Sequence, residues 1–123
     1  MMKVLLIQPV TEPLKTLQEI IERRSFKSVE NVKHYFPLGV LHIGSTLEKE
    51  GINVTILDLD KKFYDFIKNN KGRDMGSFLK ESLTSDIEHY KPDVIGISGN
   101  FNSNASFVQL CCKEIKAVDK DIK

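Results

Sequence analysis

Two short polar segments hold the residues of this 123-residue chain that are best suited to bind a ligand. They read QPVTEP at residues 8–13 and SGNFNSN at residues 98–104, and each follows an apolar run. Small side chains, hydroxyls and amides leave backbone N–H groups accessible, and a helix that starts after such a loop adds its own free N–H groups. The same residue types are also common in ordinary turns. The chemistry indicated here is binding.

Groups suited to catalysis or metal binding are dispersed. His34, His42 and His89 lie far apart in the sequence and form no spacing typical of a zinc site. Ser45 and Ser98 lack the G-x-S-x-G turn of an activated serine. Neither G-x-x-x-x-G-K-[ST] nor G-x-G-x-x-G occurs, which argues against phosphate-loop and dinucleotide-binding functions. We therefore expect no catalytic residue and no metal ligand in this segment.

Two acidic residues, Asp58 and Asp60, end the second apolar run, at a position where an acid often binds a ribose. Without the accompanying glycines they are predicted to be solvated caps. The segment after the first apolar run offers no acidic pair, so a phosphoacceptor receiver domain is not indicated either.

The elements that would position these loops follow from periodicity. Apolar runs at residues 3–9, 52–59 and 94–98 are typical of strands buried in a parallel sheet. Helical spacing is seen around Leu14–Ile21, from Pro37 to Gly51, from Phe78 to Tyr90, and after residue 104. Gly44 would let its helix approach the sheet closely, and Gly51 would end that helix in a left-handed conformation. The expected inner-face residues are Leu38, Leu41 and Leu47; Phe78, Leu79, Leu83, Ile87 and Tyr90; and Ala105, Val108, Cys112 and Ile115.

Alternation of strands and helices predicts a three-layer α/β fold with a flavodoxin-like or Rossmann-like parallel sheet. The strand order expected in this fragment is 2-1-3, with the all-apolar first strand in the centre. Residues 119–123, DKDIK, approach a fourth strand, before which the fold would be truncated. Ligands of such sheets bind where the strand order reverses, which here lies between the loops at residues 8–13 and 98–104.

Composition excludes several partners. With 18 basic and 17 acidic side chains, the net charge of +1 indicates neither nucleic acid nor an anionic membrane. The apolar run near the N-terminus is too short for a signal peptide or a membrane span. Cys111 and Cys112 are adjacent, which rarely allows a disulfide between them, so we expect reduced, buried thiols. Together these features predict a cytoplasmic protein.

Three segments resemble a known family. KVLLIQP at residues 3–9, FPLGVLHIGSTLEKEGINVTILDLD at 36–60 and KPDVIGIS at 91–98 are similar to the N-terminal cobalamin-binding domain of cobalamin-dependent radical S-adenosylmethionine enzymes. The similarity covers essentially the whole chain, in the same order. It departs from the family at Val10, where a second proline is common, and in lacking both D-x-H-x-x-G and C-x-x-x-C-x-x-C.

The resemblance implies a set of cobalamin contacts. They are Gln8 and Pro9, then Pro37, Leu38 and Gly39, and finally Ser98, Gly99 and Asn100. No histidine ligand is implied from the D-x-H-x-x-G position. An iron–sulfur cluster and S-adenosylmethionine would belong to a downstream domain that is not present here.

Two functions remain open at this point. In the first, residues 1–123 form a single cobalamin-binding domain, the N-terminal part of a longer methyltransferase- or rearrangement-type enzyme, and are not catalytic alone. In the second, the chain is a degenerate or truncated module that serves as a scaffold or interaction domain without cofactor. Besides cobalamin, the expected partners are a second copy bound through the exposed edge of the third strand, or a downstream catalytic domain.

Overall fold

The computed structural model describes residues 1–10, 14–23, 37–69, 74–99 and 105–123. Nothing is stated about the structure of the remaining residues. The described elements are β1 (Lys3–Gln8), α1 (Leu14–Arg23), α3 (Leu38–Lys49), β2 (Asn53–Asp58), α4 (Leu59–Lys68), α5 (Met75–Tyr90), β3 (Val94–Ile97) and α6 (Ala105–Val118). Among these residues no helix is long and apolar enough to cross a bilayer.

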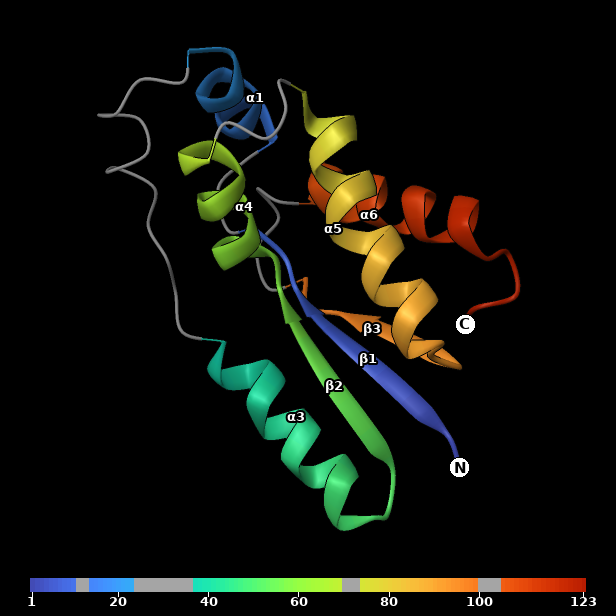
Figure 1. Cartoon of the computed structure of the whole chain (residues 1–123). Coiled ribbons are helices and arrows are strands. Elements are labelled where there is room, and N and C mark those ends of the chain that lie inside the picture. The colour runs from blue at the N-terminus through green and yellow to red at the C-terminus, as the bar shows by residue number, and fades with distance from the viewer. Residues whose placement is uncertain (11–13, 24–36, 70–73, 100–104) are drawn as a thin grey trace.

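The sheet has three parallel strands in the order β2-β1-β3, which confirms the predicted α/β fold class and strand order (Figure 1). Leu5 of β1 lies opposite Thr55 of β2 and Ile95 of β3, which sets the register of the three strands. β1 is central because its four consecutive apolar residues from Val4 to Ile7 are all buried, as a strand covered on both faces requires.

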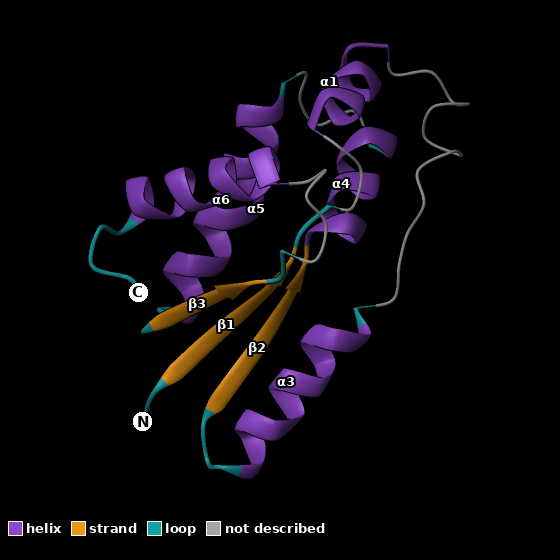
Figure 2. Cartoon of the chain, turned by 180° about the vertical axis from the view of Figure 1, so that it is seen from behind, coloured by secondary structure: helices purple, strands orange, loops and turns teal. Residues whose placement is uncertain are grey.

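Helices cover both faces of the sheet, but unequally. α3 lies on one face beside β2, whereas α5 and α6 lie on the other (Figures 1 and 2). The larger core is on the α5 side, where Phe78 of α5 packs edge-on against Phe63 and Phe66 of α4, at ring-centroid distances of 5.2 and 5.3 Å. The smaller core joins Val4 and Leu6 to Val40 of α3.

The two glycines of the α3–β2 unit behave as predicted. A Cβ on Gly44 would lie 3.4 Å from Cδ1 of Ile56, so α3 rests on β2 too closely for any side chain longer than a methyl group. Gly51 adopts a φ of +81°, the left-handed conformation that follows many helix ends.

Two of the predicted helix faces are wrong in part, although Ile115 is buried as predicted and Leu47 packs half-buried against the smaller core. In α3, Leu38 and Leu41 point outward, and Val40 and Gly44 are the buried residues. In α6, the buried residues are Phe107, Cys111 and Ile115, whereas Ala105 and Cys112 are exposed. The apolar residues of both helices extend around much of the circumference, so spacing alone could not select the inner face.

The aromatic segment after β2 is also more regular than predicted, since it forms α4. Asp58 caps this helix and accepts hydrogen bonds from the backbone N–H groups of Asp60, at 3.0 Å, and Lys61, at 3.4 Å. Asp60 is only 1% exposed, so the prediction of a solvated cap holds for Asp58 and fails for Asp60.

Candidate functional site

The ends of β1 and β3 lie side by side, at the point where the strand order reverses. Ile7 is paired with Ile97, and the Ser98 N–H donates a hydrogen bond of 3.1 Å to the Ile7 carbonyl. This bond extends the ladder to the last residue before the loop. It places Gln8 and Pro9 next to Ser98 and Gly99, which are four of the eight sequence-predicted site residues.

These four residues differ in accessibility. Gln8 and Ser98 are half-buried, Pro9 is buried, and Gly99 is exposed. A Cβ added to Gly99 would meet no atom of the described chain within 4 Å, and Gly99 does not have a positive φ. The carboxyl ends of β1 and β3 therefore offer the Ser98 hydroxyl and the Gln8 carboxamide near the open space at Gly99. These groups suit a ligand rich in amides.

The start of α3 holds three further predicted residues. Pro37 precedes the helix and its carbonyl accepts a hydrogen bond of 3.0 Å from the Leu41 N–H. Leu38 is 61% exposed, and Gly39 is exposed with open space where a Cβ would lie. Since α3 packs on β2 and β1, these residues lie on the β2 side of the sheet, away from β3 (Figure 2). Asn100, the eighth predicted residue, lies outside the described residues.

Three exposed apolar residues of α3 were not anticipated. Leu38, Leu41 and Ile43 are 61%, 36% and 55% exposed, and they come from the first half of one helix. At about 100° per residue these side chains point in different directions around the helix, so they are singly exposed apolar residues and do not form one patch. The signal in the sequence was the apolar character of this helix on all sides.

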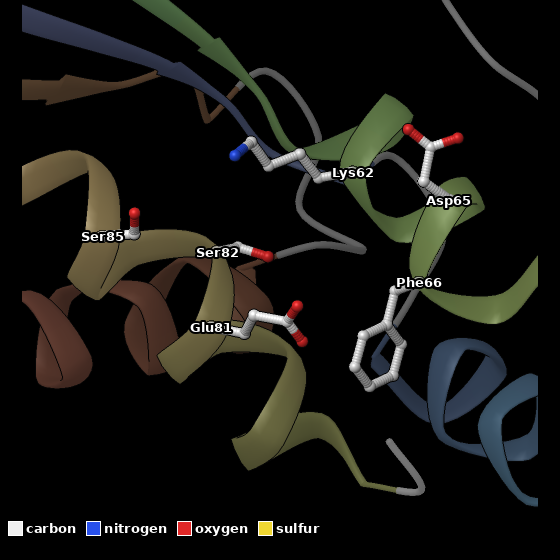
Figure 3. Close-up of a pocket in the computed structure, with 6 residues that line it drawn as sticks. All are labelled: Lys62, Asp65, Phe66, Glu81, Ser82 and Ser85. Carbon is white, nitrogen blue, oxygen red and sulfur yellow. The ribbon is translucent and has the colours of Figure 1, made fainter. Parts of the chain in front are cut away.

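A polar recess between α4 and α5 was also missed (Figure 3). It has a volume of about 340 Å³ and is lined by Lys62, Asp65, Phe66, Glu81, Ser82 and Ser85. Near it, Lys62 Nζ and Asp86 Oδ2 form an ion pair of 3.2 Å that joins the two helices. No local pattern in the sequence marked this recess, because it depends on how α4 and α5 meet.

The two cysteines have different environments. Cys111 is buried, and burial, reinforced by the neighbouring Cys112 thiol, raises its pKa to about 12. Cys112 is exposed, which corrects the prediction that both thiols are buried. Both are free thiols. The described residues contain no group of three or more histidine, cysteine or acidic side chains that could hold a metal ion.

Comparison with known proteins gives one partial similarity. No family model and no solved structure matches the chain. Over 78 residues, the chain is 36% identical to a cytidylyl-2-hydroxyethylphosphonate methyltransferase of Streptomyces wedmorensis. The similarity covers 59% of this chain and 14% of that protein. The chain is thus similar to a small part of a much longer methyltransferase.

Proposed function

We propose that this chain is a cobalamin-binding module of a radical S-adenosylmethionine methyltransferase, and that it carries no catalytic residue of its own. The observation that supports this proposal is that β1 and β3 end side by side at the reversal of strand order, where Ile7 pairs with Ile97 and the Ser98 N–H bonds to the Ile7 carbonyl. The partial similarity to a methyltransferase supports the methyltransferase-type reaction over the rearrangement type.

A corrin is a wide macrocycle edged with amides, and the polar groups of the described residues support the proposal that one binds here. The Ser98 hydroxyl and the Gln8 carboxamide would hydrogen-bond to those amides, and the open space at Gly99 would admit the ring edge. The exposed Leu38 would supply apolar contact from the β2 side. When bound, cobalamin would supply the methyl-transfer chemistry. The residues of this chain would hold and orient it and exclude water from one side.

The binding test is direct. The protein is mixed with hydroxocobalamin and desalted, and the visible spectrum of the protein fraction is recorded. Gly99→Leu should reduce the affinity about tenfold or more, equivalent to ~1.4 kcal/mol, because its side chain would fill the space assigned to the corrin. The variant should fold normally, since Gly99 needs no positive φ and a Cβ has room there.

A matched control places the same leucine elsewhere. Glu88→Leu adds it to an exposed position near the end of α5. This end of α5 lies at the starts of the strands, since Tyr90 contacts the first residue of β2. This variant should retain the parent's corrin absorbance. If the parent retains no corrin, or if Gly99→Leu and Glu88→Leu retain equal amounts, the proposed site is wrong. Absence of binding by the parent would favour the second function, a scaffold or interaction domain without cofactor.

A further inference from the structure

The recess between α4 and α5 contains a buried serine hydroxyl. Ser82 of α5 is only 6% exposed, and Figure 3 shows its side chain directed from α5 into the recess. Among the residues that the structure describes, none forms a hydrogen bond with this hydroxyl. Thr46 of α3 shows the usual alternative, because its hydroxyl donates to the His42 carbonyl one turn earlier, at 3.0 Å. Since buried polar side chains normally have a partner, the Ser82 hydroxyl is available to a molecule that enters the recess.

The charged groups around the recess favour a positively charged ligand. Lys62 supplies the one ammonium group that lines it, and this group is already paired with the Asp86 carboxylate at 3.2 Å. Asp65 and Glu81 add carboxylates from the two facing helices, and Asp65 forms no ion pair with a described residue. The electrostatic potential of the recess should therefore attract a cation. An anion would have to compete with Asp86 for Lys62.

The size of the recess and its aromatic wall favour a small ligand with an alkyl chain. The volume of about 340 Å³ lies near the lower end of the range for small-molecule sites. Phe66 lines the recess from α4, and its ring is held by edge-on contact with Phe78, at a centroid distance of 5.3 Å. An aromatic ring packs well against methylene groups and also attracts a cation. The Phe66 ring therefore suits the alkyl chain next to a charged amine.

We propose that this recess binds a small free primary amine in its ammonium form, at a site separate from the one proposed for cobalamin. A primary ammonium group has three donors. They would bond to the Ser82 hydroxyl oxygen and to the Glu81 carboxylate, and the charge of Asp65 would add attraction at the rim. The alkyl chain would lie against Phe66.

The test is an NMR titration of the protein with butylammonium chloride, in which the backbone amide shifts are followed until they saturate. Sodium butyrate, of the same chain length and opposite charge, is the matched control at equal ionic strength. Butylammonium should shift the Phe66 and Ser82 amides with a saturating curve, and butyrate should not. Shifts that stay linear with concentration, or that butyrate matches, would overturn the proposal. So would tighter binding of Nα-acetyl-lysine methylamide than of butylammonium, since the ligand would then be a lysine side chain of a partner protein.

Two substitutions test the assigned contacts. Ser82→Ala should raise the dissociation constant about threefold to tenfold, because the ammonium loses a hydrogen bond. Without ligand, the same variant should melt at the parent's temperature or higher, since alanine favours the helix and replaces a hydroxyl that no described residue binds. Asp65→Asn should raise the dissociation constant about twofold to fivefold. Ser45→Ala, at an exposed position of α3, is the matched control. Equal affinities of Ser82→Ala and Ser45→Ala, or a clearly lower melting temperature of Ser82→Ala, would show that the Ser82 hydroxyl has no role in binding.

Discussion

The Tyr90 hydroxyl, at the end of α5, lies 3.0 Å from the carbonyl oxygen of Asn53 and 2.8 Å from the side-chain oxygen of the same residue. Asn53 is the first residue of β2, so this contact ties the last turn of a helix to the start of a strand 37 positions earlier. Lys3 adds to the same cluster, because its ammonium lies 5.7 Å from the centre of the Tyr90 ring.

Tyr90→Phe removes the hydroxyl and leaves the ring. We expect the free energy of unfolding to fall by about 1 kcal/mol, the usual net contribution of a hydrogen bond. Urea unfolding followed by circular dichroism measures this change. Tyr64→Phe, at a 38% exposed position on α4, is the matched control and should change stability little. Equal effects of the two substitutions would contradict a role for the Tyr90–Asn53 contact.

Gly44 offers a test of how closely α3 rests on β2. Gly44→Ala should stabilise the protein by up to about 1 kcal/mol, because alanine favours the helix and its Cβ would be in ordinary contact with Ile56. Gly44→Leu should destabilise it by about 1–3 kcal/mol, since the longer side chain would push α3 from the sheet. Thermal unfolding should give a higher melting temperature for Gly44→Ala and a lower one for Gly44→Leu than for the parent. Stabilisation by leucine would show that the contact is loose.

The cysteines should react at different rates. At pH 8 a thiol reagent such as iodoacetamide should label Cys112 in the folded protein and spare Cys111, whose raised pKa keeps it protonated as well as buried. Mass spectrometry identifies the labelled residue. Cys112→Ser should abolish rapid labelling, and Cys111→Ser should not. Rapid labelling of Cys111 in folded protein would contradict its buried position.

The same raised pKa predicts a pH dependence of stability. The unfolded Cys111 thiol ionises near its usual pKa of 9.0, whereas the folded thiol ionises near 12. Its contribution is therefore complete below pH 9 and is lost as the pH rises towards 12. Cys111→Ala removes this contribution, so the difference in unfolding midpoint between parent and variant should shrink between pH 8 and pH 10.5. A constant difference would contradict the shift.

Asp74 predicts the opposite pH dependence, in which stability is lost as the pH falls. Its carboxylate caps α5 by accepting hydrogen bonds from the Ser77 N–H at 2.7 Å and the Ser77 hydroxyl at 3.1 Å, which lowers its pKa below 3.8. The cap stabilises the fold above that pH and is lost as the pH falls below it. Asp74→Ala should lower the melting temperature at pH 7, and the difference should narrow below pH 4. Asp74→Asn, which retains a capping oxygen, should lower it less.

Local signals in the sequence were sufficient for much of the fold. The unbroken apolar run from Val4 to Ile7 predicted a central strand, and Gly51 marked the end of α3. These are backbone and burial requirements that single residues reveal. The inward direction of Val40 and Cys111 could not be predicted. Each helix carries apolar residues around much of its circumference, so only tertiary packing selects the buried face.

The candidate site was likewise predictable only in part. Strand order placed Gln8 beside Ser98, because parallel strands bring their carboxyl ends to one edge. The recess lined by Lys62 and Ser82 depends on the angle at which α4 meets α5, which no local pattern specifies. The exposure of Leu38 depends likewise on how α3 is rotated on β2.

The hydrogen bonds of Tyr90 with Asn53 and of the Asp93 N–H with the Lys3 carbonyl, at 2.8 Å, both lie where the strands begin. The candidate site lies where the strands end. Substitutions of side chains in the loops after β1 and β3 would therefore leave these hydrogen bonds at the strand starts unchanged. Such a division would let natural selection change residues at one end of the sheet without a matching loss of foldability at the other.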